Sequence, residues 1–180
     1  MSGKMILVLG GARSGKSSYA QELATKAGGQ VIYAATAQAG DDEMRMRIAA
    51  HQAERPASWQ TVEAPRQVGM ALLSYMTNAD VVLLDCITLL TSNVLLGLPE
   101  SATVDEVQQE MNREVDGLLT AFENGEADWI VVSNEVGLGL VPAYALGRTY
   151  RDVLGRVNQR LAQVADEVLF MVAGIPMKVK

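Results

Sequence analysis

The 180-residue sequence contains one cysteine and one histidine, and its 15 lysine and arginine residues are outnumbered by 21 acidic residues. With Cys86 alone the chain cannot form an intramolecular disulfide, and no group of cysteine and histidine has the spacing of a zinc site. This pattern is typical of a reducing cytoplasm. The net charge of −6 argues against general binding to nucleic acid or anionic membranes, because both need a basic protein surface.

Long apolar runs are also missing. The apolar stretch at residues 5–9 is too short for a membrane span or for the core of a signal peptide, and no other stretch approaches the roughly 18 residues that a membrane helix needs. The chain length is that of one domain with a sizeable core. We therefore expect a soluble, cytoplasmic protein without a membrane span, in which residues 1–180 form a single domain.

The clearest pattern present is a glycine-rich segment, G-x-x-x-x-G-K-S, placed between the apolar residues 5–9 and a helical pattern. In this context it is typical of a phosphate-binding loop, whose glycines let the backbone N–H groups surround a phosphate at a helix N-terminus. Lys16 can reach the β- and γ-phosphates, and Ser17 can bind Mg²⁺. The alternative is a chance glycine turn, which the complete motif disfavours. The predicted phosphate-binding residues are Gly10, Gly11, Ala12, Arg13, Ser14, Gly15, Lys16 and Ser17.

Strand and helix patterns alternate along the chain. We expect strands at residues 5–9, 30–35, 59–63, 81–85, 129–133 and 168–172, with a short edge strand at 177–180. We expect helices at residues 18–26, 41–53, 67–77, 87–98, 104–122 and 150–165, with Thr103 as the N-cap of the fifth. This alternation predicts an α/β fold with a doubly wound, mostly parallel sheet and helices on both faces. Ligands of such sheets bind beyond the carboxyl ends of the strands.

Three residues at predicted strand ends are candidates for chemistry. Asp85 closes an apolar strand, where nucleotide-binding folds place an acid that holds Mg²⁺; an ordinary strand-ending aspartate is the alternative. Glu63 is either a solvated strand end or an acid facing the ligand, and the residues alone do not decide. Cys86 is interpreted as a small core residue, because nothing in the sequence marks its thiol as activated.

His51 is the single histidine, on a predicted polar helix. Counting back by four places Arg47 and Glu43 on roughly the same helical face. A neighbouring guanidinium disfavours the imidazolium form, and a neutral imidazole is the state that a nucleophile or base needs. Taken alone, a histidine on a polar helix is more often an ordinary surface residue. Charge periodicity does not overturn that expectation.

Several motifs together resemble one known family. They are GGARSGKS at residues 10–17, the Ala-Thr pair at 35–36, DDEMRMRI and the following histidine at 41–51, RP-x-x-W at 55–59, T-x-E at 61–63, LLDCIT at 83–88, SNEVG at 133–137 and GRVNQRLA at 155–162. The chain resembles the bifunctional adenosylcobinamide kinase/adenosylcobinamide-phosphate guanylyltransferases of cobalamin biosynthesis, almost from end to end.

The resemblance implies two reactions in one enzyme. First, the hydroxyl of the aminopropanol arm of adenosylcobinamide takes the γ-phosphoryl group of ATP or GTP. Then a histidine, which here can only be His51, attacks the α-phosphorus of GTP, releases pyrophosphate and passes GMP to adenosylcobinamide phosphate. The resemblance also implies a RecA-like sheet of the P-loop NTPase class and a homotrimer.

The same resemblance implies which residues contact the nucleotide. The catalytic residues are His51 and Lys16, and Ser17 and Asp85 hold Mg²⁺. Besides the glycine-rich segment, GTP contacts are implied for Ala35, Thr36, Ala37, Gln52, Ala53, Glu54, Arg55, Glu63 and Asp85. Ala37 departs from the family, which has a hydroxyl residue there, so one hydrogen bond to the nucleotide is in doubt.

The corrinoid-binding residues are open. Arg151, Arg156, Asn158 and the 134–135 loop are candidates, with a solvated helix face as an equal explanation for the arginines. Two rival functions also remain: a P-loop kinase or NTPase for another small molecule, without a covalent histidine, and a nucleotide-binding regulatory module without transferase activity.

Overall fold

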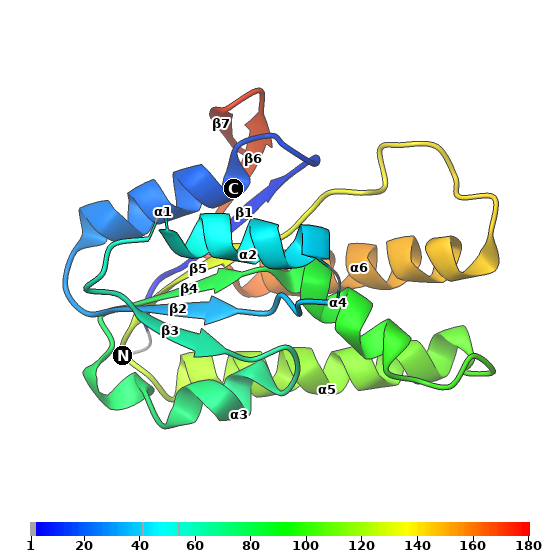
Figure 1. Cartoon of the computed structure of the whole chain (residues 1–180), viewed down its shortest axis with the longest axis horizontal. Coiled ribbons are helices and arrows are strands. Elements are labelled where there is room, and N and C mark those ends of the chain that lie inside the picture. Colours follow the sequence, from blue (N-terminus) through cyan, green and yellow to red (C-terminus); the bar gives the residue numbers. More distant parts are fainter. Residues whose placement is uncertain (1–2, 41, 54) are drawn as a thin grey trace.

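The computed structural model describes residues 3–40, 42–53 and 55–180. In this part of the chain seven strands form one sheet in the order β3-β2-β4-β5-β1-β6-β7, parallel except for β7 (Figure 1). The strands are β1 (Met5–Gly10), β2 (Val31–Ala35), β3 (Gln60–Glu63), β4 (Val81–Asp85), β5 (Asp128–Val132), β6 (Glu167–Val172) and β7 (Ile175–Lys178). The helices are α1 (Lys16–Ala27), α2 (Asp42–Ala53), α3 (Val68–Leu73), the short 3-10 helix η1 (Met76–Asn78), α4 (Ile87–Leu96), α5 (Val104–Glu123) and α6 (Ala145–Val164).

The predicted α/β fold class with a mostly parallel sheet is confirmed. Strands β2 and β4 are buried along almost their whole length, as expected for apolar strands covered on both faces. Strand β5 lies between β1 and β4, so the strand that leads into the glycine-rich segment is not adjacent to the strand that ends at Asp85. Both strands still end at the same edge of the sheet, because they run parallel.

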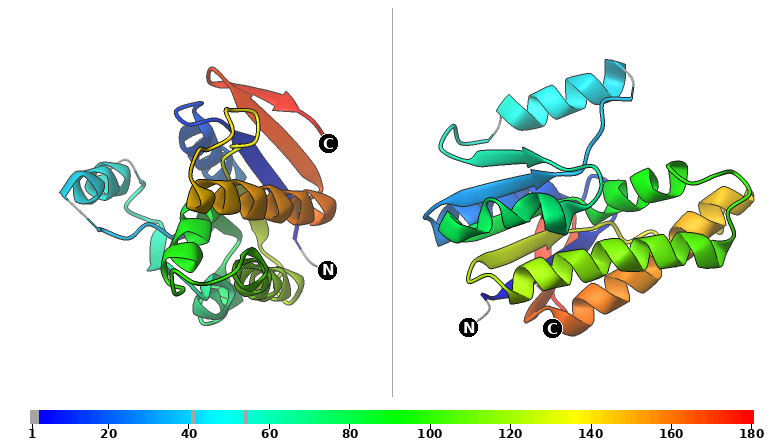
Figure 2. Two further views of the ribbon diagram at one scale, coloured as in Figure 1. Left: turned by 90° about the vertical axis from the view of Figure 1, so that its right-hand side faces the viewer. Right: turned by 90° about the horizontal axis from the view of Figure 1, so that it is seen from below.

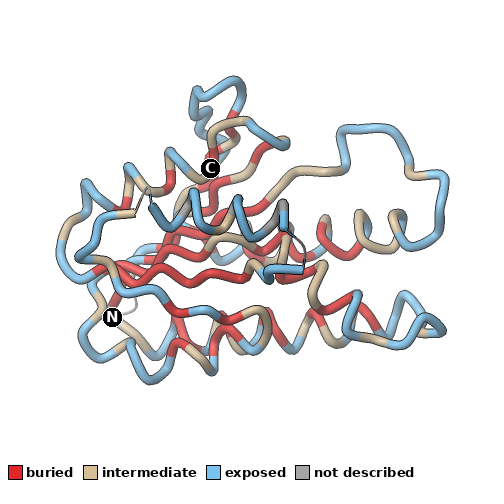
Figure 3. The backbone as a smooth tube through the Cα atoms, viewed as in Figure 1, coloured by how far each residue is buried: buried red, intermediate tan, exposed pale blue. Residues whose placement is uncertain are grey.

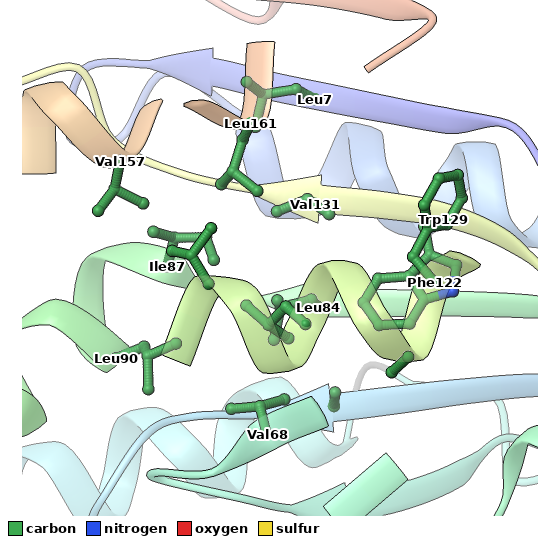
Figure 4. Close-up of a cluster of buried hydrophobic side chains, with 14 of the residues drawn as sticks. Leu7, Val68, Leu84, Ile87, Leu90, Phe122, Trp129, Val131, Val157 and Leu161 are labelled. Carbon is green, nitrogen blue, oxygen red and sulfur yellow. The ribbon is translucent and has the colours of Figure 1, made fainter. Parts of the chain in front are cut away.

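The larger hydrophobic core lies between the sheet and helices α3 to α6. It includes Trp129 of β5, whose ring meets Phe122 of α5 edge to face at 6.0 Å, and Leu84, Leu90 and Leu161 (Figure 4). Each buried side chain of this size contributes about 1.5–3 kcal/mol relative to an exposed one. The face packed on these four helices is therefore the main source of stability.

The opposite face of the sheet packs on α1. Its residues Ala20 and Ala24 are fully buried and join a second core cluster with Val8, Tyr33 and Leu83. The short alanine side chains let the helix approach β4 and β5 closely. This packing fixes the helix that follows the glycine-rich segment.

Helix α2 stands apart from these layers. Figure 2 shows it set off from the other helices, beside the β3 edge of the sheet. The described side chains of α2, such as Met46 and Gln52, are mostly exposed, whereas the central strands are buried (Figure 3). The helix is therefore held mainly by its connections to β2 and β3.

Several boundaries differ from the sequence-based expectation, most of them by one or two residues, such as the start of α1 at Lys16. The helix expected at 67–77 divides into α3 and η1, since residues 74–78 include serine, threonine and asparagine, which favour turns over helices. Helix α6 begins at Ala145, five residues earlier than expected. The sequence did not indicate its first turn, because these residues are mostly exposed and lack the apolar spacing of residues 150–165. Helix α4 ends at Leu96, two residues earlier than expected. Strand β7 lies at 175–178, directly after a turn in which Ala173 and Gly174 have positive φ angles.

The helix α5 was predicted closely. Thr103 is its N-cap, as expected, and its hydroxyl accepts a hydrogen bond from the backbone N–H of Glu106 at 3.2 Å. The Glu106 carboxylate in turn accepts one from the Thr103 N–H at 2.7 Å, which completes a capping box. Within the described part of the chain, no helix combines the length and apolar character needed to cross a membrane.

Candidate functional site

A cavity of about 520 Å³ opens at the carboxyl edge of β2, β3 and β4, and we refer to it as the edge cavity. Its walls come from α1, the segment after β2, α2, β3, the segment after β4, and the segment after β5. The lining residues predicted from the sequence are Ser17, Ala35, Ala37, Gln52, Arg55, Glu63, Asp85 and Asn134. The edge cavity therefore brings together Ser17 and most of the implied nucleotide contacts outside the glycine-rich segment, although they are scattered along the chain.

The glycine-rich segment, residues 10–17, connects β1 to α1, and we refer to it as the phosphate loop after its predicted role. Gly10 and Gly15 have φ angles of 154° and 92°, values that L side chains rarely adopt. A Cβ atom at Gly10 would also lie 2.6 Å from Ser14 Oγ and 2.7 Å from the Met171 carbonyl oxygen. Only glycine fits there, so the sequence pattern reflects a real steric requirement. Ser17 is the loop residue that lines the edge cavity itself.

Lys16, the first residue of α1, is 7% exposed, and its Nζ donates a hydrogen bond to the Gly11 carbonyl oxygen at 2.6 Å. Burial lowers the pKa of this amine, and the nearby acidic groups of Cys86 and Asp85 oppose that effect. The loop carbonyl is a weak partner for a buried cation. A phosphate group beside it would be a stronger partner, because it carries the opposite charge.

Asp85 ends β4 at the edge cavity, and its Oδ2 accepts a hydrogen bond from the Tyr33 hydroxyl at 2.8 Å. The two residues come from neighbouring strands, since Ala35 of β2 is paired with Asp85 and Tyr33 lies two residues earlier on the same face. Burial, with the nearby Asp85 charge, raises the pKa of Tyr33 far above its ordinary value, so the phenol remains a donor. Sequence reasoning missed Tyr33, which looks like one more apolar residue of a buried strand.

Thr36, directly after β2, is fully buried. Its Oγ1 donates to the Cys86 carbonyl oxygen at 2.7 Å and accepts from the Cys86 N–H at 2.8 Å. The Asn93 side chain donates to the Thr36 carbonyl oxygen at 2.8 Å and to that of Pro65 at 2.9 Å. The Thr36 side chain thus joins the ends of β2 and β4 and does not line the edge cavity.

Cys86 matches the interpretation of an unactivated thiol. Burial, reinforced by the neighbouring Asp85 charge, raises the pKa of Cys86 to about 12. A thiol with this pKa has almost no nucleophilic thiolate at neutral pH. The peptide bond between Asp85 and Cys86 is cis.

The end of α2 and the residues that follow it form another wall of the edge cavity. Arg55 places its guanidinium carbon 3.5 Å from the centre of the Tyr33 ring, and Tyr33 stacks with Trp59 at 6.4 Å between ring centres. Gln52 donates to Glu63 Oε1 at 3.4 Å. Glu63, undecided from the sequence, therefore lines the edge cavity beside α2. Its carboxylate can accept hydrogen bonds from a ligand there.

The structure describes only part of the segment around His51. His51 lies on α2, one residue before Gln52. The side chains of His51, Glu43 and Arg47 are not among those that the structure describes, so their expected shared face stays a prediction. Glu54 lies outside the described residues. Ala53 is on α2 and exposed, and it does not line the edge cavity.

Hydrogen bonds with buried polar side chains hold the segment after β5 in place. The Asn134 N–H donates to Thr88 Oγ1 at 2.7 Å, and the Asn158 side chain donates to the Asn134 carbonyl oxygen at 3.0 Å. Asn158 Oδ1 also accepts from the Ser133 hydroxyl at 2.6 Å. Asn158, a candidate for corrinoid binding, is buried, with only 6% of it exposed. It supports the Asn134 backbone instead of facing a ligand.

The two candidate arginines of α6 lie away from the edge cavity. Arg156 is exposed and donates to Gln108 Oε1 of α5 at 3.4 Å, and Arg151 pairs with Asp152 at 3.4 Å. Farther along the helix, Arg160 donates to Asp116 of α5 at 2.6 Å. These contacts serve helix packing and surface charge. They give no independent reason to assign the arginines to a ligand.

Comparison with known proteins places this geometry in context. Residues 6–179 match a family model described as cobinamide kinase / cobinamide phosphate guanyltransferase. The chain is 44% identical over 181 residues to the bifunctional adenosylcobalamin biosynthesis protein CobU of Salmonella typhimurium. The aligned region covers 98% of this chain and 99% of that protein. It is 42% identical to CobU of Escherichia coli with the same coverage, and 44% identical to CobP of Pseudomonas aeruginosa over 97% of this chain and 96% of that protein.

Proposed function

The chain belongs to the cobinamide kinase / cobinamide phosphate guanyltransferase family, and we propose that one nucleotide site at the edge cavity serves both reactions. It is a transferase of adenosylcobalamin biosynthesis that uses nucleoside triphosphates and a cobinamide substrate. We propose a cytoplasmic location, where these nucleotides are available.

In the kinase reaction, the hydroxyl oxygen of the aminopropanol arm of adenosylcobinamide attacks the γ-phosphorus of ATP or GTP. The bond between the γ-phosphorus and the bridging oxygen breaks, the nucleoside diphosphate leaves and the hydroxyl proton is released. Lys16 and the backbone N–H groups of residues 10–17 hold the phosphates and stabilise the charge that develops during transfer. The buried position of Lys16 strengthens this effect, because less water screens the charge.

In the guanylyl reaction, a ring nitrogen of His51 attacks the α-phosphorus of GTP and pyrophosphate leaves. GMP is then carried on the ring as a phosphoramidate. A phosphate oxygen of adenosylcobinamide phosphate attacks the same phosphorus, the bond to His51 breaks, and adenosylcobinamide-GDP forms. Imidazole suits this role because it is a good nucleophile when neutral and a good leaving group when protonated.

The donor set at the edge cavity fits Mg²⁺. Ser17 and Asp85 supply a hydroxyl and a carboxylate oxygen to the same cavity, and Mg²⁺ prefers oxygen ligands. Among the described residues, no group of three or more histidine, cysteine, aspartate or glutamate residues is placed to hold a metal. Mg²⁺ bound with nucleotide commonly takes one or two protein ligands and completes its shell with phosphate oxygens and water. When bound, it would neutralise phosphate charge in both reactions.

One observation carries the proposal. Gln52, the residue after His51, lines the same cavity as Ser17 of the phosphate loop and Asp85 of β4. Helix α2, which bears the proposed nucleophile, therefore lines the same cavity as the phosphate loop and the end of β4, which bear the proposed phosphate and metal contacts. Arg55 and Glu63 also line this cavity and support the implied nucleotide contacts.

Incubation with GTP labelled at the α-phosphate tests the covalent step. We expect acid-labile, base-stable label on the wild-type protein and none on His51→Ala. The label should leave the protein when adenosylcobinamide phosphate is added. Labelling of His51→Ala, or no label on the wild-type protein under turnover conditions, would contradict the role of His51 and favour a kinase without a histidine intermediate.

We also propose that the protein is a homotrimer. The segment from residue 136 to 146, which projects beyond the sheet in Figure 1, exposes five large apolar side chains. They are Leu138, Leu140, Val141, Tyr144 and Leu146. Exposed apolar side chains gathered on one segment favour contact with another chain. Light scattering should give the mass of three chains, and Leu140→Asp should lower it; a monomeric wild-type protein would exclude the assembly.

A further inference from the structure

Tyr33 contacts two of the residues that the proposed function assigns to the nucleotide and its metal. Its hydroxyl donates to Asp85 Oδ2 at 2.8 Å, and the face of its ring lies 3.5 Å from the Arg55 guanidinium carbon. Tyr33 itself is 2% exposed, although it belongs to the set of residues that line the edge cavity. It is therefore placed to act on the site through its neighbours.

We propose that Tyr33 is a positioning residue, whose hydroxyl fixes the Asp85 carboxylate for Mg²⁺ while its ring supports Arg55 against the nucleotide. The inference rests on the proposed role of Asp85 as a Mg²⁺ ligand. A carboxylate that binds a metal through one oxygen is commonly oriented by a hydrogen bond to the other. Here the hydroxyl of Tyr33 occupies Oδ2, and no described residue donates a hydrogen bond to Oδ1.

The Tyr33 ring is held firmly enough for this role. Its backbone lies in β2, which pairs with β4 on one side and β3 on the other. The ring also stacks with Trp59 at 6.4 Å with an angle of 25° between the planes. A donor that is already immobilised loses little conformational entropy when Asp85 takes up its metal.

The test measures how much Mg²⁺ strengthens nucleotide binding. The probe is guanosine 5′-(α,β-methylene)triphosphate, whose α–β bridge resists the attack by His51. Calorimetry gives its affinity in saturating Mg²⁺ and in excess EDTA, and the ratio of the two affinities is the Mg²⁺ effect. For Tyr33→Phe, which removes the hydroxyl and keeps the ring, we expect this ratio to fall about tenfold, the lower end of the range for residues that orient metal ligands. The affinity in EDTA should not change.

Tyr150→Phe is the matched control. The Tyr150 hydroxyl is also partly buried and donates to the Thr88 carbonyl oxygen at 3.2 Å, so its removal deletes a tyrosine hydrogen bond that does not involve Asp85. The Mg²⁺ effect of this variant should equal that of the wild-type protein. Thermal unfolding of each variant verifies that the proteins are folded.

A double-mutant cycle separates this inference from the proposed function. Asp85→Asn should reduce the Mg²⁺ effect, and adding Tyr33→Phe to it should cause no further loss, because the two groups act as one unit. If Asp85→Asn leaves the Mg²⁺ effect intact, the metal role of Asp85 and the role of Tyr33 both fail. If Asp85→Asn reduces it and Tyr33→Phe does not, the inference alone is overturned. Equal loss of affinity with Mg²⁺ and with EDTA would also overturn it, since a general structural defect acts in both.

Discussion

The phosphate loop and helix α2 differ in how they are attached to the molecule. The loop connects β1 to α1, and both elements are packed into the cores on the sheet. Helix α2 stands beside the β3 edge with mostly exposed side chains (Figure 2). The difference suggests a division of labour, in which the rigid region holds the triphosphate and the detached helix carries a nucleophile. One bound nucleotide can then be attacked at its γ-phosphorus by the corrinoid hydroxyl or at its α-phosphorus by His51.

The largest expected effect separates the two regions by reaction. His51→Ala should reduce formation of adenosylcobinamide-GDP by about a thousandfold or more, because no other group replaces a covalent nucleophile. Formation of adenosylcobinamide phosphate should persist, since the phosphate loop is intact. Chromatography of the corrinoid products measures both reactions. Loss of both products in a folded variant would mean that α2 is needed for the kinase reaction as well.

A substitution in the packed region of the molecule should mainly lower the free energy of unfolding. Asn158→Ala leaves the Ser133 hydroxyl and the Asn134 carbonyl oxygen without their buried partner. We expect the free energy of unfolding to fall by about 1–3 kcal/mol, the usual cost of unpaired buried polar groups. Urea unfolding measures it. Stability equal to the wild type would show that water replaces the amide and that Asn158 is not a structural support.

A change on the α2 side should be seen first in binding. Arg55→Ala removes the cation over the Tyr33 ring and part of the cavity wall, and we expect GTP affinity to fall about tenfold, with much less loss of stability than for Asn158→Ala. Arg45→Ala, an exposed position on α2 beside Asp42, is the control and should bind GTP as the wild type does. Equal loss in both variants would attribute the effect to surface charge instead of to Arg55.

The contrast between the regions also explains what could be predicted from the sequence. The shape of the phosphate loop could be predicted, because its residues lie within one short segment and the positive φ angles at Gly10 and Gly15 are a local steric requirement. The phosphate and Mg²⁺ roles of its residues stay predictions. The position of Asp85 beside the edge cavity was predicted for a similar reason: it ends a run of apolar residues, and parallel strands bring their ends to one edge. The α/β fold followed from the alternation of strand and helix patterns.

The contacts that sequence reasoning missed join distant segments. Tyr33 meets Asp85, 52 residues away, because β2 and β4 are paired in one particular register, which no local pattern indicates. Asn158 follows the polar spacing of α6, yet the Asn134 backbone packs against that face of the helix and buries it. In both cases the strand order and helix packing, and not the residue type, decide the role.

The most direct test of the division of labour asks whether the phosphate loop serves both reactions. Lys16→Met keeps most of the length of the unbranched side chain and removes its charge. Two quantities are measured on this variant: the rate of adenosylcobinamide phosphate formation, and the rate at which α-labelled GTP transfers label to the tryptic peptide that begins at Ile48 and contains His51. We predict that both fall by about a hundredfold or more, as when a charge-stabilising donor is removed. Full labelling of His51 with a lost kinase reaction would contradict the account and require a second nucleotide site.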